Sequence, residues 1–168
     1  MLVFITGASK GSLGAEAAIS LAAAGPKHFI LIGRNKSKID PVIGEIGNID
    51  SKIKVTFISG DMCDNESLRK AAAEINGLDV TIDSIICSAG TMALREFTPS
   101  KDGIENQFAA NYVGHFLMTN LILGKLATKS SFITVTSSGY ENSEVRFDDY
   151  NFQVNIYGRP QGGLRCVR

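Results

Sequence analysis

A glycine-rich turn near the start of the chain limits the possible folds more than any other stretch of the sequence. The turn runs from Gly7 to Gly14, includes Gly11, and follows a short apolar run, Leu2–Thr6. An alanine-rich segment with helical periodicity, Leu13–Ala24, overlaps the end of the turn. A buried strand that passes through a tight turn into a helix is typical of parallel α/β folds, in which the helix returns the chain to the next strand.

The same alternation of strand-like and helix-like segments continues along the chain. Proline and glycine interrupt the second helical segment, and Asp64 is a suitable N-cap for the third. Because the strands are continuous apolar runs, helices are expected on both faces of the sheet. We therefore predict a doubly wound, Rossmann-like parallel sheet of five strands over residues 1–157, and an irregular tail over residues 158–168. The further strands expected are His28–Ile32, Ile53–Ser59, Ile82–Cys87 and Ser131–Ser137, and the further helices are Ser37–Ile49, Asn65–Ile75 and Gly103–Leu126.

Composition and charge exclude several classes of protein. A chain of 168 residues with 44% hydrophobic and 20% charged residues is typical of one globular domain, and a formal net charge of zero gives no basic surface for nucleic acid. Its apolar runs are too short to span a bilayer. The three cysteines, Cys63, Cys87 and Cys166, lie far apart in the sequence and form no metal-ligand pattern. We expect a cytoplasmic protein that binds no metal, nucleic acid or membrane.

The glycine turn has the pattern of a phosphate-binding loop. Glycines let the backbone turn tightly and approach a pyrophosphate, and the helix that follows offers free N–H groups and the positive end of its dipole. The alternative is an ordinary turn whose glycines serve no ligand. The candidate cofactor-binding residues in the turn are Gly7, Ser9, Lys10, Gly11, Leu13 and Gly14.

The end of the second strand distinguishes between the two nicotinamide coenzymes. An acidic residue at this place binds the ribose 2′-hydroxyl of NAD, whereas a basic residue accommodates the 2′-phosphate of NADP. The chain has Gly33-Arg34-Asn35 here with no carboxylate nearby, and Lys10 adds a second cation. We therefore predict NADP(H) as the cofactor; the alternative is that Arg34 and Lys10 are only solvated surface charges.

Six motifs follow one another along the chain, and together they resemble the short-chain dehydrogenase/reductase family in its retinol-dehydrogenase-like and fungal branch. The resemblance covers about residues 2 to 158. Each motif also has a local explanation, as a turn former, a tight strand exit, a surface asparagine or the end of a strand. The motifs are Thr6–Gly14, Asp61-Met62, Cys87-Ser88-Ala89-Gly90, Asn111, Val135-Thr136-Ser137-Ser138 and Phe147-Asp148-Asp149-Tyr150-Asn151.

The resemblance implies hydride transfer between a nicotinamide and a small carbonyl or alcohol substrate. It implies that Asp61 and Met62 contact the adenine and that Ser88, Ala89 and Gly90 also bind the cofactor. Three residues would be catalytic: Ser138 would hydrogen-bond the substrate oxygen, Asn111 would hold a water, and Tyr157 would supply the proton.

The sequence departs from the family pattern in ways that affect these expectations. The glycine turn is one residue longer than the family's, which could shift the start of the helix and loosen the pyrophosphate contact. The lysine that would lower the tyrosine pKa belongs four residues after Tyr157, but Gln161 occupies that position. The family's later strands have no counterpart, so the fifth strand is expected to be an exposed edge.

The tail suggests a hypothesis of its own. When the codons of residues 161–168 are read one nucleotide later, suitable choices within the degenerate code give Lys-Ala-Ala-Cys-Asp-Val-Phe. That reading restores a lysine four positions after Tyr157, so the chain is expected to be a frameshifted or truncated product of a reductase gene. Transcript sequencing tests this.

Three functions remain open from the sequence: an NADPH-dependent carbonyl reductase or alcohol dehydrogenase, a non-catalytic NADP-binding module, and a product that does not fold stably. The long helical segment Gly103–Leu126 offers apolar surface for a possible homo-oligomer.

Overall fold

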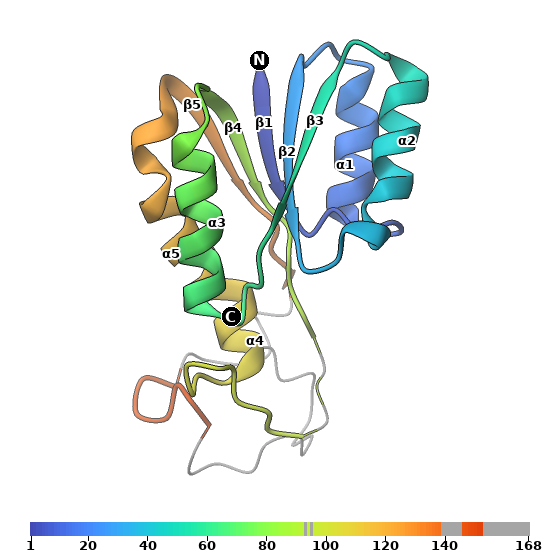
Figure 1. Cartoon of the computed structure of the whole chain (residues 1–168). Helices are drawn as coiled ribbons and strands as arrows, with labels where there is room; N and C mark the ends of the chain where they lie inside the picture. The colour runs from blue at the N-terminus through green and yellow to red at the C-terminus, as the bar shows by residue number, and fades with distance from the viewer. Residues whose placement is uncertain (93, 95, 139–145, 153–168) are drawn as a thin grey trace.

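The computed structural model describes residues 1–92, 94, 96–138 and 146–152, and its centre is a parallel β-sheet (Figure 1). The strands lie side by side in the order β3-β2-β1-β4-β5, and each neighbouring pair is parallel. This is the predicted Rossmann-like sheet with five strands. The strands are β1 (Leu2–Thr6), β2 (His28–Gly33), β3 (Lys54–Ser59), β4 (Ile82–Cys87) and β5 (Leu126–Thr134).

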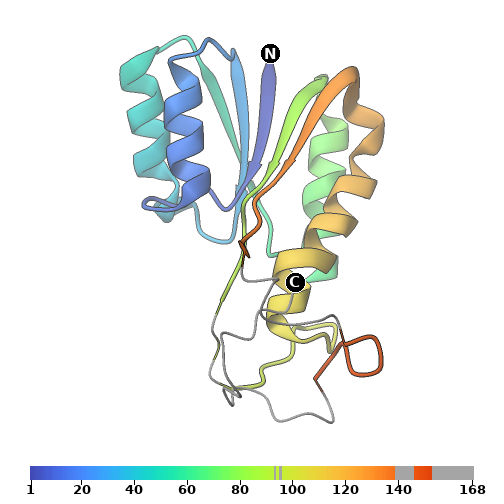
Figure 2. The same ribbon diagram turned by 180° about the vertical axis from the view of Figure 1, so that it is seen from behind.

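Helices cover both faces of the sheet, which confirms the doubly wound arrangement. One face is covered by α1 (Leu13–Ala22) and α2 (Asp40–Ile49), and the other by α3 (Asn65–Gly77) and α5 (Gly114–Leu121) (Figures 1 and 2). Alternate residues of β1 supply the two cores: Ile5 belongs to the apolar cluster under α1 and α2, and Phe4 to the cluster under α3 and α5. No helix in the described part of the chain is long and apolar enough to cross a membrane.

Local capping explains where the first helices begin. Ser12 caps α1 by accepting a hydrogen bond from the Ala15 N–H at 3.1 Å, and Asp64 caps α3, as predicted. Helix α1 begins at Leu13 despite the extra residue of the glycine turn, because a tight turn closed by the Ser12 N–H and the Ser9 carbonyl (3.0 Å) absorbs it. Pro41 lies in the first turn of α2, where its missing N–H costs no hydrogen bond.

The expectation of one long helix over Gly103–Leu126 is wrong: the helix has other ends, and it is not a regular α-helix throughout. The segment contains a short helix α4 (Asn106–Phe108), a π-helical turn (Ala109–Val113), α5, and a 3-10 turn (Leu123–Lys125). Gly103 has φ +74°, which is incompatible with a right-handed helix, and the Glu105 carboxylate caps α4 two residues later. The periodicity of the apolar residues therefore marked the right element but overestimated its length.

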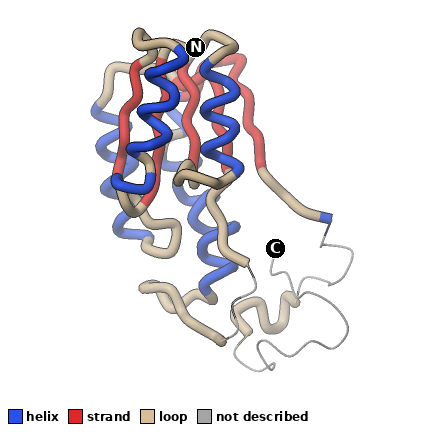
Figure 3. Tube along the Cα trace, turned by 90° about the vertical axis from the view of Figure 1, so that its right-hand side faces the viewer, coloured by secondary structure: helices blue, strands red, loops and turns tan. Residues whose placement is uncertain are grey.

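The expected boundaries of the fifth strand, Ser131–Ser137, are also wrong. β5 begins five residues earlier and ends at Thr134. β5 lies at the edge of the sheet, as expected, and an edge strand can contain polar residues (Figure 3). The polar residues in its first half hid the start of the strand from a search for apolar runs. Phe132 and Ile133 are 57% and 47% exposed there.

Candidate functional site

The order of the strands places the reversal of the chain between β1 and β4. From β1 the chain proceeds to β2 and β3 on one side, and it then returns to β4 on the other side. In open parallel sheets, ligands bind outside the carboxyl ends of the two strands at such a point. The glycine turn follows β1 and the Ser88-Ala89-Gly90 loop follows β4, so both predicted motifs lie at this end of the sheet.

Glycine allows the two loops to approach each other very closely. A Cβ atom on Gly7 would lie 2.6 Å from the Ala89 Cα and 2.7 Å from its N, and Gly7 also has φ +70°. A Cβ atom on Gly14, in the first turn of α1, would lie 2.8 Å from the Gly7 carbonyl oxygen. The Ser12 hydroxyl donates a 2.6 Å hydrogen bond to that same carbonyl. Gly7 and Gly14 thus bring the backbone and the N-terminus of α1 together, as a bound diphosphate requires.

A basic cavity of about 680 Å³ adjoins the glycine turn at the end of β2. Its described lining includes three cationic side chains and no carboxylate. The Lys10 N–H donates to the Lys38 carbonyl at 2.9 Å, which holds the glycine turn against the segment after β2. The Lys10 ammonium lies 3.3 Å from Glu45 of α2, whereas Arg34 is exposed. The lining residues of the basic cavity are Ser9, Lys10, Arg34, Asn35, Ser37, Lys38 and Pro41.

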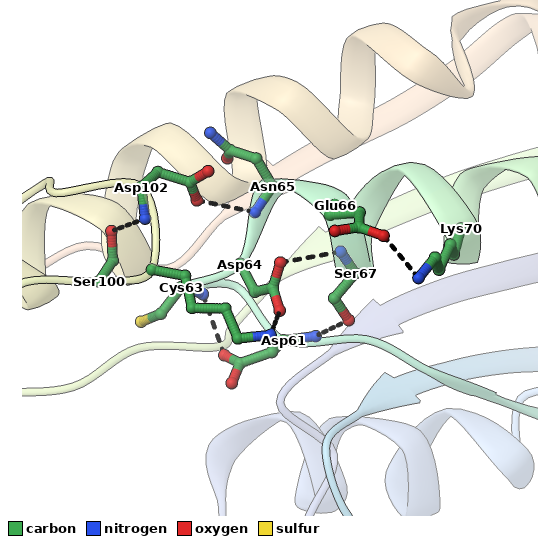
Figure 4. A network of polar contacts seen from close by, with 10 residues as sticks. Asp61, Cys63, Asp64, Asn65, Glu66, Ser67, Lys70, Ser100 and Asp102 are labelled. Carbon is green, nitrogen blue, oxygen red and sulfur yellow. Dashed lines mark hydrogen bonds and ion pairs between the residues drawn. The ribbon is translucent and has the colours of Figure 1, made fainter.

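The loop that carries Asp61 and Met62 is held by local hydrogen bonds (Figure 4). The Asp61 carboxylate accepts from the Cys63 N–H at 3.0 Å, and the Asp61 N–H donates to the Ser67 hydroxyl at 3.1 Å. Asp61 therefore does form a turn, which was the local alternative, and its contact with an adenine remains a prediction. The side chain of Met62 is buried in the core beneath α3 and α5.

The same loop and the first residue of α3 are tied to Lys101 and Asp102. Asp64 forms an ion pair with Lys101, and the Asp102 carboxylate accepts from the Asn65 N–H at 2.9 Å (Figure 4). The hydrogen bond from Lys101 above all holds the pKa of the Asp64 carboxyl below its usual value. The β3–α3 loop is thus braced from two directions.

A second cavity of about 450 Å³, here called the β4 cavity, opens beside the loop after β4. It is lined by residues 87–92, by residues 134–137, and by Gln107, Asn111, Tyr112 and His115. Ser137 is on its wall, whereas the predicted catalytic Ser138 is the next residue along and is exposed. Burial raises the pKa of the Cys87 thiol to about 11, so this lining group is uncharged at neutral pH.

Asn111 braces the helix against the loop after β4. Its side-chain oxygen accepts from the Thr91 N–H at 2.8 Å, and its side-chain nitrogen donates to the Thr91 carbonyl at 2.9 Å. The π-helical turn carries Asn111, and a Cβ atom on Gly90 would lie 3.0 Å from its side-chain oxygen. The alternative of a surface asparagine is therefore wrong. The predicted role in holding a water is not tested by these contacts.

Two buried polar residues of this site, Thr6 and His115, were missed by the sequence reasoning. The Thr6 hydroxyl accepts from the backbone N–H groups of Ser88 (3.0 Å) and Ala89 (2.9 Å), and it lies 2.8 Å from His115 Nε2. His115 Nδ1 lies 3.1 Å from the Asn111 carbonyl. The only available signal was spacing, since His115 follows Asn111 by four residues and so lies on the same helix face.

Tyr157 and Gln161, on which the proton-transfer expectation depends, lie outside the described residues, as does the tail from 158 to 168. The segment before them is anchored to the start of α4. Asn151 is buried, accepts from the Glu105 N–H at 2.6 Å and donates to the Gly103 carbonyl at 3.0 Å.

Comparison with known proteins shows which protein family this chain resembles in sequence. Residues 1–151 match the family model described as short chain dehydrogenase. The chain is 33% identical over 154 residues to the oxidoreductase fscI of Fusarium equiseti, covering 88% of this chain and 60% of the relative. It is 34% identical over 157 residues to human retinol dehydrogenase 13, covering 92% of this chain and 46% of the relative.

A solved structure is also similar to this chain in both sequence and fold. The crystal structure of an uncharacterized protein from Mycobacterium paratuberculosis has 30% sequence identity and a TM-score of 0.78, over 94% of this chain and 53% of the other. The chain therefore spans about half the length of the relatives that it matches.

Proposed function

Because the chain belongs to the short-chain dehydrogenase family, whose members are oxidoreductases, we propose that it binds NADP(H) and serves hydride transfer with a small carbonyl or alcohol substrate. The observation that carries the choice of coenzyme is the basic cavity, in which Lys10, Arg34 and Lys38 surround a space beside the glycine turn. The chain spans only about half the length of its relatives, so we propose this activity for it and do not transfer it from them.

The residues present fit the parts of such a coenzyme. The close backbone approach at Gly7 and Gly14 and the positive end of the α1 dipole suit a diphosphate, and the basic cavity suits one further phosphate. The Asp61 carboxylate and the Met62 backbone would face the adenine, since the Met62 side chain is buried in the core, while the loop after β4 would border the nicotinamide. When bound, the nicotinamide supplies or accepts the hydride.

The chain's own residues would orient the substrate. The β4 cavity is enclosed on one side by Asn111 and His115 and on the other by Thr134–Ser137, so a small carbonyl compound placed there lies next to the loop after β4. Ser138 would hydrogen-bond its oxygen and Tyr157 would donate the proton. A neutral Gln161 cannot favour the phenolate of Tyr157 as a lysine ammonium does.

Gln161 is the specific observation that favours a second function, a non-catalytic NADP-binding module. The two functions differ in turnover alone. The module predicts tight NADPH binding with no oxidation of the coenzyme by a panel of small aldehydes and ketones. The enzyme predicts NADPH oxidation that depends on both protein and substrate.

Titration of the full chain with NADPH and with NADH, followed by coenzyme fluorescence, tests the binding proposal. Arg34→Ala should weaken NADPH binding by about 10- to 100-fold, the value of a hydrogen bond between charged groups, and leave NADH binding nearly unchanged. The matched control is Arg69→Ala, which removes the same charge from an exposed position on α3. Equal affinity of the wild-type chain for both coenzymes would contradict the role of the basic cavity.

A further inference from the structure

The hydrogen bonds at Thr6 determine where the hydroxyl proton points. A threonine hydroxyl has one proton to donate and two lone pairs to accept with. The N–H groups of Ser88 and Ala89 both donate to it, at 3.0 and 2.9 Å, and they occupy its two acceptor positions. The third partner, His115 Nε2 at 2.8 Å, must therefore accept the hydroxyl proton. Nε2 consequently carries no proton of its own.

The other ring nitrogen completes the assignment. His115 Nδ1 lies 3.1 Å from the Asn111 carbonyl oxygen, which can only accept, so Nδ1 carries the proton and donates it. The imidazole is neutral and in a single tautomer. A second proton on Nε2 would face a hydroxyl whose lone pairs are both in use, so one of the two amide hydrogen bonds would break. Burial, opposed by the Asn111 carbonyl, lowers the pKa of His115 in agreement with this geometry.

The helical turn around His115 contacts the end of β1 and the loops after β3 and β4. Asn111 holds Thr91 in the loop after β4, and His115 holds Thr6 at the end of β1. A Cβ atom on Gly114 would lie 2.5 Å from the Met62 carbonyl oxygen, so α5 also rests directly on the loop after β3. These loops carry the predicted contacts to the nicotinamide, the diphosphate and the adenine.

We propose that His115 is a positioning residue of the dinucleotide site, which it maintains as a neutral imidazole protonated on Nδ1 alone. By accepting the Thr6 hydroxyl proton, it directs both Thr6 lone pairs at the loop after β4 and holds that loop against the glycine turn. The effect on binding rests on the proposed function, whereas the tautomer does not.

His115 is the only histidine in the described lining of the β4 cavity, and imidazole is the side chain whose ordinary charge change falls between about pH 5 and 8. The other titratable groups that line this cavity or lie beside the helix are Cys87, Tyr112 and Asp61. Burial raises the pKa of the Cys87 thiol to about 11. Protonation of His115 in acid should therefore act on this contact.

Nitrogen NMR of the full, ¹⁵N-labelled chain tests the tautomer directly. We expect long-range imidazole correlations typical of a protonated Nδ1 and an unprotonated Nε2 at pH 7.5, and a titration midpoint below the ordinary value of about 6.5. An Nε2-protonated ring, or a midpoint above the ordinary value, would overturn the proposal. This measurement needs no variant and no coenzyme.

Two variants then test the effect on binding. His115→Gln keeps a side-chain acceptor for the Thr6 hydroxyl and cannot titrate, whereas His115→Leu has no acceptor. We expect H115L to bind NADPH about fivefold more weakly than the wild type at pH 7.5, and H115Q to bind it nearly as well. As the pH falls through the His115 midpoint found by NMR, the wild type should lose affinity relative to H115Q, which shares every other titrating group, including those of NADPH.

The possible results separate this proposal from the proposed function. Wild-type affinity for NADPH in H115L would overturn the binding role of His115 and leave coenzyme binding intact. A folded wild-type chain that binds no coenzyme would overturn the proposed function and the binding role together, and NMR on that sample would still report the tautomer.

Discussion

The close approach of the glycine turn to the loop after β4 predicts a large effect of one methyl group, in Gly7→Ala. The added Cβ would lie 2.6 and 2.7 Å from two backbone atoms of Ala89, neither of which can rotate away. The left-handed φ of +70° costs about 1–2 kcal/mol for an L side chain, and overpacking costs about 1–3 kcal/mol. The variant should therefore lose about 2–5 kcal/mol of unfolding free energy.

Two further glycines separate these contributions. Gly11 has φ +80° but open space around its Cβ position, so Gly11→Ala should lose only the conformational part, about 1–2 kcal/mol. Gly44 lies within α2, also with open space, and Gly44→Ala should gain about 0.5–1 kcal/mol because alanine favours the helix.

Urea denaturation of the three variants and the wild type, compared at equal m-values, measures these differences. NADPH titration of the same samples should show lost binding in Gly7→Ala and unchanged binding in Gly44→Ala. If Gly7→Ala were no less stable than Gly11→Ala, the reasoning about the Ala89 backbone would be refuted, because the two variants differ in that contact.

Three other changes follow from local contacts. Ser12→Ala removes the N-cap of α1 and should cost about 1 kcal/mol in urea denaturation; an unchanged midpoint would contradict the capping role. Because its pKa is lowered in the folded state, Asp64 contributes stability above about pH 4 that is lost as the pH falls through the folded value, so wild-type stability should decline more steeply in acid than that of Asp64→Asn. Urea midpoints at pH 7, 5 and 3 measure this, and parallel curves would argue against it. Cys87, with a pKa of about 11, should resist iodoacetamide at pH 8 until the chain unfolds, as peptide mass spectrometry can show; rapid labelling of the folded chain would disagree.

The sequence predicted the sheet well because the strand signal is local. β1 and β2 carry short, continuous apolar runs that end at threonine and glycine, and their buried position makes that pattern necessary. β4 has a polar pair, Asp83 and Ser84, before its apolar second half. The predicted cap at Asp64 likewise acts within three residues of itself. The glycine turn was identified for the same reason, since its special φ values need glycine at particular positions.

The errors concern features that depend on distant contacts or on solvent. β5 was expected too late because an edge strand does not need apolar residues on both faces, and its polar first half gave no signal. The π-helical turn within Gly103–Leu126 left the average periodicity helical. Thr6 and His115 are 109 positions apart, so no local pattern could reveal their hydrogen bond.

The position of β5 has a consequence for the motions of the site. β1 is flanked by strands on both sides and is buried throughout, whereas β5 in the described structure pairs with β4 and is largely exposed to solvent. Amide hydrogens of β1 should exchange with solvent mainly through global unfolding, and those of β5 through local detachment. Because Thr134, the last residue of β5, lines the β4 cavity with the three residues that follow it, one wall of this cavity is continuous with a strand that we expect to detach locally.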